Sequence, residues 1–235
     1  MWDQGSPNDL ASVALQREGK VERTTRETSI SVHLLLNGCS KDTLVETGIP
    51  FLNTFYTILA KEACMTLKIN CKGDLWVDDH HTAEDVSIAI GQCLNQALGN
   101  KAGLNRMWVS EATRETAGSD VSAAKVEVTM DLSNRPYFGH NLHETLGRQE
   151  YVVEGGESNP LSCEMLEHCL DSLVMNSHMT VHIVEKSNAE CEQVSSVADV
   201  VLCTATAFGR ALRVCSMVDE RRAGTTASSK GTLSV

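Results

Sequence analysis

Met65-Thr66-Leu67-Lys68-Ile69 recurs 114 positions later as Met179-Thr180-Val181-His182-Ile183, and both stretches alternate apolar and polar residues as half-buried strands do. Further along, the run from Ala89 to Leu94 (AIGQCL) recurs from Ala207 to Leu212 (AFGRAL), at an offset of 118. Repeat units of solenoid proteins are only about 20–50 residues long. A repeat as long as this one therefore indicates two duplicated halves.

The residues around these matched strands predict the same order of elements in each half. The expected elements of the first half are a strand within 21–36, a helix over 51–63, a strand over 65–70 and a helix over 84–98. Those of the second half are a strand over 124–132, a helix over 161–174, a strand over 179–184 and a helix over 197–215. The sequence therefore predicts an α/β (α+β) fold of two tandem similar β/α halves. Each half is expected to be a small sheet with helices packed on one face, and a pseudo-twofold axis is expected to relate the halves.

Composition suggests where the folded part of the chain begins and ends. Residues 1–20 mix Gly, Ser, Asp, Gln and Glu and are expected to form a flexible N-terminal arm. Residues 21–217 are expected to form a single domain, with halves of about 21–115 and 120–217. Residues 218–235 are rich in Arg, Gly, Thr and Ser and are expected to form an extended C-terminal tail. Within the domain, we expect the helix that starts at His80 to lie near the helix over 197–215.

The overall composition excludes several classes of function. The chain has 235 residues, 42% of them hydrophobic, and a net charge of −11, which argues against a nucleic-acid surface. No apolar run approaches the ~20 residues that a membrane helix needs. The nine cysteines include no CxxC pair, and the first twenty residues resemble no targeting segment. We therefore expect free thiols in a reducing compartment, the cytoplasm.

The run from Asp78 to Asp85 (DDHHTAED) holds the strongest candidate metal ligands. If a helix starts here, His80 and Glu84 lie one turn apart, and imidazole with carboxylate suits manganese, zinc or iron. Neighbouring His80 and His81 would serve two different ions. The alternative interpretation is a polar helix entry, with Asp79 as the cap and the acids favoured by the helix dipole.

The repeat exposes an asymmetry in these ligands. At the offset of 118, His80, His81 and Glu84 correspond to Ala198, Asp199 and Leu202, so the second half lacks the HHxxE element. At the offset of 114, His168 stands where the first half has Thr54. Each half thus carries one metal-binding element that the other half has lost.

The chain resembles imidazoleglycerol-phosphate dehydratase, the histidine-pathway enzyme, from about Val21 to Leu233. The motifs that carry the resemblance are Glu22–Thr28 (ERTTRET), Thr47–Leu52 (TGIPFL), Asp78–Asp85 (DDHHTAED), Asp131–Tyr137 (DLSNRPY), Leu161–His168 (LSCEMLEH) and Ser228–Gly231 (SSKG). The resemblance implies an α/β subunit of two similar halves and a cage of twenty-four copies, with active sites between subunits. It also implies two manganese ions that hold the substrate imidazole, and Arg, Lys and Ser side chains that hold its phosphate.

Carried over position by position, the resemblance assigns roles to nine residues. It implies metal ligation by His80, His81, Glu84 and His168, phosphate binding by Arg106, Arg135, Ser229 and Lys230, and a catalytic role for Glu22. The other half of the family's metal ligands is missing. Asn53-Thr54 stands at one of those places, and Ala198, Asp199 and Leu202 stand at the second HHxxE. Glu62 replaces a further family histidine, and Thr206 replaces a lysine that follows the second HHxxE.

Three functions remain open on this reasoning. The chain is a degenerate, catalytically impaired family member that keeps the cage and part of the phosphate pocket, or it is an active dehydratase. An active dehydratase would need a rebuilt site that uses Asp199, Glu190 or Cys191. In the third interpretation the chain is a non-catalytic subunit that co-assembles with a complete paralogue, because the family's sites lie between subunits.

One further cluster has the residue types of a metal site. The run from His140 to His143 with Glu144 (HNLHE) offers two imidazoles and a carboxylate. It lies in an expected strand and loop, and we favour an exposed surface strand over a ligand cluster.

Overall fold

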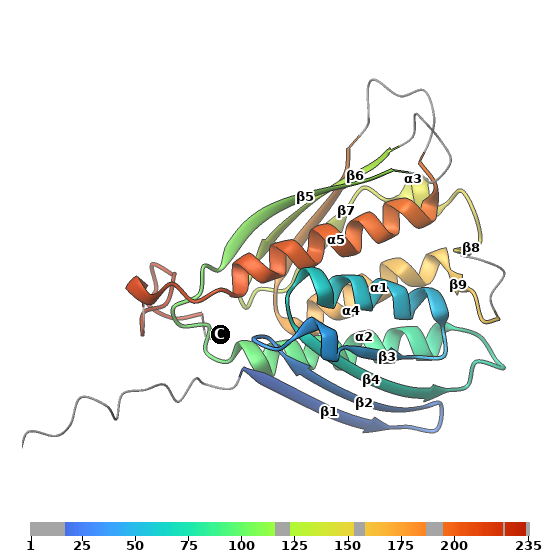
Figure 1. Ribbon diagram of the computed structural model, residues 1–235, viewed down its shortest axis with the longest axis horizontal. Coiled ribbons are helices and arrows are strands. Elements are labelled where there is room, and N and C mark those ends of the chain that lie inside the picture. The colour runs from blue at the N-terminus through green and yellow to red at the C-terminus, as the bar shows by residue number, and fades with distance from the viewer. Residues whose placement is uncertain (1–16, 116–122, 153–157, 187–194, 223, 234–235) are drawn as a thin grey trace, which may run out of the picture.

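The computed structural model describes residues 17–115, 123–152, 158–186, 195–222 and 224–233. It contains two four-stranded sheets with a layer of helices between them (Figure 1). The buried apolar side chains of both halves form one continuous core in this helix layer. The predicted fold class is confirmed.

The first sheet has the strand order β1-β2-β4-β3. Its strands are β1 (Glu18–Thr24), β2 (Thr28–Leu35), β3 (Leu44–Glu46) and β4 (Thr66–Gly73). β1, β2 and β4 pair antiparallel, whereas the short edge strand β3 is parallel to β4. β4 contains the alternating stretch from Met65 to Ile69 that revealed the repeat, and its apolar residues Leu67 and Ile69 are buried.

The second sheet repeats this arrangement with the strand order β5-β6-β10-β7. Its strands are β5 (Met107–Glu115), β6 (Ala123–Asp131), β7 (Tyr137–His140) and β10 (Thr180–Glu185). Here too the edge strand, β7, is parallel to its neighbour β10, and the other pairs are antiparallel. β5 had not been predicted and belongs to the second sheet, so the structural repeat divides between Leu98 and Met107, earlier than the expected boundary near residues 115–120.

The four long helices pack between the sheets in an exchanged arrangement. They are α1 (Pro50–Glu62), α2 (His80–Leu98), α4 (Cys163–Ser177) and α5 (Val197–Ser216). α2 lies on β1 and β2 of its own half and packs against α4 of the other half, while α5 lies on β5 and β6 and packs against α1. Our expectation that the long helices α2 and α5 pack near one another is wrong, because a shorter helix of the opposite half covers each of them.

Gly91 and Gly209 occupy equivalent positions in the repeat and mark the two helix crossings. A Cβ atom on Gly91 would lie 2.7 Å from the carbonyl oxygen of Leu173 in α4. On Gly209 it would lie 2.5 Å from the carbonyl oxygen of Leu59 in α1. Backbone atoms cannot swing aside as a flexible side chain can, so the helices touch through these glycines.

We predict that Gly91→Ala and Gly209→Ala each lower the free energy of unfolding by about 1–3 kcal/mol, the usual cost of overpacking a close-packed interior. The sign is informative, because alanine is the better helix former by about 1 kcal/mol and would stabilise an uncrowded position. Urea unfolding measures the effect, with exposed Gln92→Ala as the control on the same helix. An unchanged or higher stability in the glycine variants would contradict the close crossing.

The segment after α5 folds back onto the body of the protein. Val218 forms a bridge with Leu104, the Gly103 amide donates to the Thr225 carbonyl at 2.7 Å, and the Asp219 amide donates to Gly103 at 2.8 Å. A short 3₁₀ helix, η2 (Glu220–Arg222), lies within this segment. At the other end, residues 1–16 of the expected arm lie outside the described residues, and β1 already begins at Glu18.

The remaining elements are short. They are the 3₁₀ helix η1 (Ser40–Asp42), helix α3 (His143–Leu146), and the paired strands β8 (Tyr151–Val152) and β9 (Leu161–Ser162).

The eight described cysteines are all free, and six of them are buried. Burial raises the pKa of the Cys93 thiol to about 12 and that of Cys71 to about 11, so these thiols stay protonated at neutral pH. Among the described helices, none combines the length and apolar character needed to cross a bilayer.

Candidate functional site

A polar cavity of 340 Å³ lies where the C-terminal segment meets the loop before β5 and the loop after β6. Its lining consists of Arg106, Ser133, Arg135, Ser228, Ser229, Lys230, Thr232 and Leu233. These residues come from three distant parts of the sequence, and all four expected phosphate-binding residues are among them. The fold thus collects three cations and several hydroxyl groups at one place on an acidic chain.

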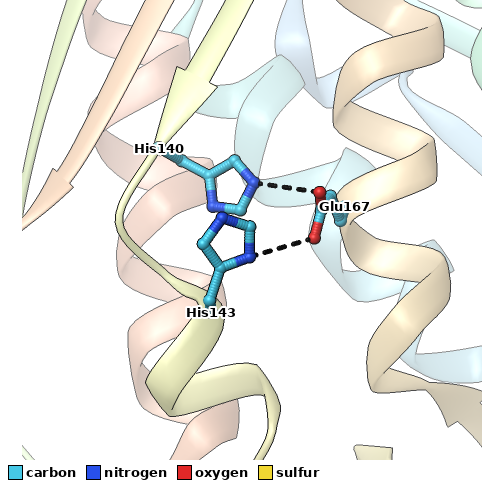
Figure 2. A group of neighbouring side chains, drawn as sticks. All are labelled: His140, His143 and Glu167. Atoms are coloured by element: carbon cyan, nitrogen blue, oxygen red, sulfur yellow. Dashed lines mark ion pairs between the residues drawn. The ribbon is translucent and has the colours of Figure 1, made fainter.

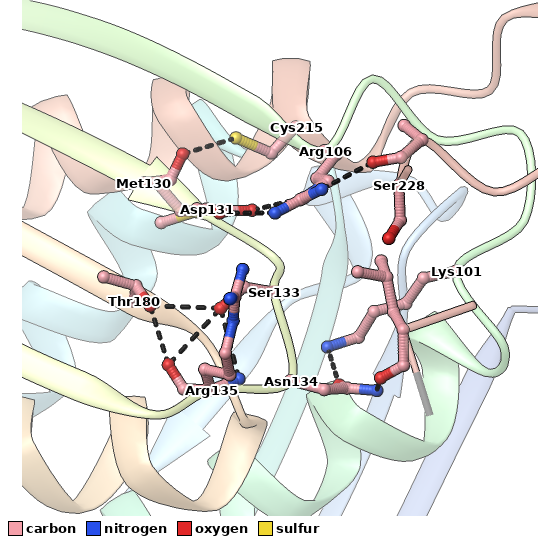
Figure 3. A network of polar contacts seen from close by, with 12 residues as sticks. Lys101, Arg106, Met130, Asp131, Ser133, Asn134, Arg135, Thr180, Cys215 and Ser228 are labelled. Carbon is pink, nitrogen blue, oxygen red and sulfur yellow. Dashed lines mark hydrogen bonds and ion pairs between the residues drawn. The ribbon is translucent and has the colours of Figure 1, made fainter. Parts of the chain in front are cut away.

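Arg106 is the most firmly held of these cations. Its guanidinium donates to both carboxylate oxygens of Asp131, with Nε–Oδ1 at 2.7 Å and Nη2–Oδ2 at 2.9 Å, and to the Ala227 carbonyl at 2.5 Å (Figure 3). The hydrogen bonds to Asp131 raise the pKa of Arg106. The Arg106 backbone has a φ of 74°, a left-handed conformation that is uncommon outside glycine. The ion pair with Asp131 holds the Arg106 side chain in place but also neutralises much of its positive charge.

Arg135 and Lys230 are exposed, and their charges are less neutralised by nearby acidic groups than that of Arg106. Among the described residues, neither side chain forms an ion pair. The loop that carries Arg135 is nevertheless held in place by two hydrogen bonds of the Arg135 backbone (Figure 3). The Arg135 amide donates to the Ser133 hydroxyl at 3.1 Å, and the Arg135 carbonyl accepts from the Thr180 hydroxyl at 2.7 Å. These two side chains are therefore the ones best able to bind an incoming anion.

Lys101 lies beneath the same region and is almost completely buried. Its ammonium donates to the side-chain oxygen of Asn134 and to the His178 carbonyl at 3.3 Å, and burial lowers its pKa to about 8. Asn134 in turn donates to the carbonyl of Leu233 at 2.5 Å. Lys101 thus connects, through Asn134, the β6–β7 loop to the C-terminal segment, a role that no sequence pattern indicates beyond its position near Arg106.

His80, Glu84, Glu164 and His168 form a second cluster, at the crossing of α2 and α4. The ring centroids of His80 and His168 lie 5.6 Å apart. His80 Nε2 is 3.9 Å from Glu84 and His168 Nε2 is 3.8 Å from Glu164, one helical turn away in each case. All four side chains are at least 41% exposed, which leaves the cluster open to ligands and to other chains.

His81 is directed to a different place. Its Nδ1 atom lies 3.1 Å from a carboxylate oxygen of Asp74, which is buried, and its Nε2 atom is 3.8 Å from Glu27. The hydrogen bond with Asp74 raises the pKa of His81, and Glu27 adds to the effect. The neighbouring histidines therefore diverge, as expected if each were to serve a separate ion.

The carboxylates around these histidines hold the helix starts together. Asp79 is not a side-chain cap of α2, contrary to one interpretation of the sequence. Its carboxylate accepts from the Ser162 amide and hydroxyl at 2.6 and 2.9 Å, and so fixes the start of α4. Asp78 accepts instead from the His80 amide at 3.0 Å. Asp79 thus joins the start of the first half's helix to that of the second half.

Glu22, the expected catalytic residue, lies apart from both histidine clusters within one chain. It is exposed on β1 and lines a separate depression of 310 Å³ with Asn70 and Lys72. Its neighbour Arg23 pairs with Asp85, which also accepts from Thr28 at 2.6 Å. The Glu22–Thr28 and Asp78–Asp85 motifs therefore contact each other through this buried carboxylate.

Comparison with known proteins identifies the family. The model of the imidazoleglycerol-phosphate dehydratase family matches residues 47–212. Imidazoleglycerol-phosphate dehydratase 1 of Arabidopsis thaliana is 36% identical over 97% of this chain and 76% of its own length. The chain belongs to the imidazoleglycerol-phosphate dehydratase family. The dehydratase of Gloeobacter violaceus is 35% identical over 90% of this chain and 95% of its own length.

Two solved structures of the same family share the fold. The dehydratase of Pyrococcus furiosus superposes with a TM-score of 0.64 at 24% identity and covers 90% of this chain and 99% of its own. That of Staphylococcus aureus gives a TM-score of 0.63 at 22% identity and covers 86% of this chain and 99% of its own. Imidazoleglycerol-phosphate dehydratases are metal-dependent. The histidine clusters are therefore the relevant places to examine for ligands.

The second half has ion pairs and buried apolar residues where the dehydratase resemblance places metal ligands. Asp199 pairs with Arg114 at 2.9 Å, and its amide donates to the hydroxyl of Ser196, the N-cap of α5, at 3.0 Å. Val200 and Leu202 are buried, and Ala198 packs against the core. Asp199 is thus engaged by a cation and a cap, which does not favour its use in a rebuilt site. Glu190 and Cys191, the other proposed replacements, lie outside the described residues.

Helix α1 also contributes an ion pair at a position where the family resemblance differs. Glu62, which stands where the resemblance places a histidine, accepts from Arg210 of α5 at 2.9 Å. The α1–α5 crossing is the repeat equivalent of the α4–α2 crossing that carries His168 and His80. The α2–α4 pair therefore carries the imidazoles and carboxylates, whereas α1 and α5 are joined by the Arg210–Glu62 pair and have Thr54 and Ala198 at the repeat equivalents of His168 and His80.

His140 and His143 are not on an exposed surface strand, so that expectation is wrong for His140. Only 5% of the His140 side chain is exposed, and both histidines lie close to Glu167 on α4 (Figure 2). The sequence run suggested Glu144 as the acidic partner. The partner is Glu167, more than twenty residues away, because α4 packs against β7.

Proposed function

We propose that this chain is a dehydratase-family protein that binds imidazole-glycerol phosphate but, as a homo-oligomer, turns it over inefficiently. The observation that carries the proposal is the Arg114–Asp199 ion pair, together with the buried Val200 and Leu202, at the place of the second metal element. A cation that already pairs with the one remaining carboxylate opposes a divalent ion there. The half of the chain that keeps His80 retains the more suitable ligands.

Binding of the substrate's phosphate is supported by the cavity around Arg135 and Lys230. Exposed cations on a fixed loop can donate charge-assisted hydrogen bonds to phosphate oxygens. Ser229 adds a hydroxyl, and Arg106, held by Asp131, adds a positioned guanidinium edge. The same chemistry would accept a different small phosphorylated ligand, so the imidazole end must provide the rest of the specificity.

For the metal, the donor set fits one ion better than two. His80, Glu84 and His168 share one exposed crossing, and imidazole with carboxylate is a donor set suited to manganese, which we propose as the ion. A bound divalent ion would supply Lewis-acid stabilisation to the substrate imidazole. His81, held by Asp74, would need ligands from another chain to complete a second site.

We further propose that the chain assembles into a cage of twenty-four copies in the cytoplasm. The exposed apolar residues at the start of β5 support subunit contacts, since Met107, Trp108 and Val109 are 58%, 49% and 51% exposed. If the histidine clusters of one chain are completed by a neighbour, a complete paralogue could provide the missing set. In that second candidate function this chain is a structural partner that contributes its phosphate pocket and half of the metal ligands.

Calorimetry and elemental analysis on the purified oligomer test the proposal together. We expect imidazole-glycerol phosphate and inorganic phosphate both to bind, and at most one manganese ion per subunit to survive gel filtration. Lys20→Ala, an exposed charge change on β1 remote in sequence from the pocket residues, serves as the control. No binding of either phosphate compound at low salt, or two tightly held ions per subunit, would each refute part of the proposal.

A further inference from the structure

Two imidazoles and one carboxylate converge between α3 and α4, outside the residues to which the family resemblance assigns a role. His140 Nε2 lies 3.4 Å from one oxygen of Glu167, and His143 Nδ1 lies 3.5 Å from the other (Figure 2). The two rings are 4.4 Å apart between centroids. One ligand atom from each residue lies within 4.8 Å of the other two, so a single ion could reach all three after a small contraction.

The elements that hold these residues are fixed independently of any ligand. His140 ends β7, which pairs with β10, and Phe138 of the same strand stacks on the His140 ring with centroids 5.0 Å apart. His143 opens α3, whose Thr145 side chain donates to Glu185 at 2.5 Å. Such supports keep the imidazoles facing Glu167 and reduce the ordering that ion binding would require.

The environment also offers room for a further ligand. A cavity of 510 Å³ borders the cluster and is lined by His143 and Glu167 as well as by Asp79, His80 and Glu164. His140 is the buried member of the cluster, with 5% of its side chain exposed, while His143 is 68% exposed. Three protein ligands beside an accessible cavity are the pattern of metal sites that keep one position for water or a substrate.

We propose that His140, His143 and Glu167 form a divalent transition-metal site, with zinc as the best match to a His₂Glu donor set and water from the cavity as the fourth ligand. Two ligand atoms about 2.0–2.1 Å from a zinc ion at the tetrahedral angle lie about 3.4 Å apart, close to the spacing of each histidine nitrogen from Glu167. Ligation by His140 Nε2 moves that ring's proton to Nδ1, so the present hydrogen bond from the Leu142 amide to Nδ1, at 3.1 Å, gives way.

This site differs from the His80–His168 cluster in one testable respect. All three ligands belong to one chain, so ion binding needs no neighbouring subunit and does not depend on the proposed function. Glu167 and His168 are adjacent on α4 but point to different partners, His140 and His143 in one case and His80 in the other. Loss of one cluster should therefore leave the other able to bind.

The test is metal titration of the chelator-stripped oligomer with Zn²⁺, and with Co²⁺ read by its visible absorption. A Cys39→Ser/Cys64→Ser background removes the two exposed thiols of the described residues as competing ligands. In that background we expect one zinc equivalent that His143→Asn and Glu167→Gln each weaken by at least about 10–100-fold. His80→Asn/His168→Asn should retain it, and so should His33→Asn, which removes an imidazole that pairs with Glu18 at 2.6 Å.

Circular dichroism and thermal unfolding show whether each variant is folded, and the largely exposed His143 makes His143→Asn the least disruptive of them. Absence of a zinc equivalent in the starting protein would overturn the proposal. So would equal zinc affinity in the starting protein and in folded His143→Asn and Glu167→Gln. Phosphate calorimetry on the same samples reports the proposed function separately, because none of these residues lines the phosphate cavity.

Discussion

The manganese-loaded homo-oligomer is expected to dehydrate imidazole-glycerol phosphate at least about 10³-fold more slowly than a relative that carries both HHxxE elements. Loss of a single group that merely supports a metal ligand costs about 10–100-fold, and here several direct ligands are replaced. Ala198 and Leu202 offer no donor atoms, and Asp199 is held by Arg114. A steady-state assay beside a complete relative, with elemental analysis of both, measures the difference.

Two variants make this prediction specific. Asp199→Asn should leave the manganese content unchanged, because the Asp199 carboxylate forms an ion pair with Arg114 and is not expected to bind a metal. The triple change Ala198→His, Asp199→His and Leu202→Glu restores the missing element and should raise both manganese content and turnover. Two tightly bound ions in the unaltered chain, with turnover comparable to that of the complete relative, would overturn the impaired-enzyme interpretation.

The second large effect is expected at the phosphate cavity, where Arg106 and Arg135 should behave differently. Arg135→Ala removes an exposed cation with no ion pair among the described residues, so it should weaken phosphate binding by about 10–100-fold and leave stability nearly unchanged. Arg106→Ala should weaken binding and also lower the free energy of unfolding by roughly 2–3 kcal/mol. That cost is below the usual one for a fully buried pair, because Arg106 and Asp131 are 15% and 21% exposed.

Calorimetry with inorganic phosphate and urea unfolding separate the two effects. Lys20→Ala makes the same change in net charge at an exposed residue that does not line the cavity, and it controls for the general electrostatic field. If Arg135→Ala and Lys20→Ala bind phosphate with equal affinity, Arg135 does not contact the anion. If Arg106→Ala is as stable as the unaltered chain, its pairing with Asp131 is only a surface contact.

Much of the fold could be predicted because its two halves repeat. The alternating strand at Met65 and the apolar helix from Val197 have strong periodic signals, and both elements formed close to their expected bounds. β5 gave a weaker signal, since Met107, Trp108 and Val109 are all exposed and do not alternate. The exchange of helices between halves could not be predicted, because periodicity reveals which face of a helix is buried but not which element covers it.

In the candidate sites, contacts between residues close in sequence could be predicted, whereas contacts between distant residues could not. Pairs one turn apart, such as His80 with Glu84, could be predicted from spacing, and the structure brings them together. Contacts made by distant residues could not. Nothing local links Glu167 to His140, and the contact of Arg106 with the segment around Ala227 depends on how the chain folds back after α5. The phosphate set was reached only through family resemblance.

The exchanged helices have a consequence for the history of a duplicated chain. The crossing at Gly209 is as tight as the one at Gly91, although only the helices at Gly91 still carry a histidine cluster. Each half buries the apolar face of a helix of the other half. Neither half can therefore be deleted after it loses its catalytic residues, because the deletion would expose apolar surface on the remaining half. Selection can then relax at the exposed helix starts while it stays strict at the crossings. Such a half is retained because the fold needs it, and the residues at its former ligand positions can change and form other contacts.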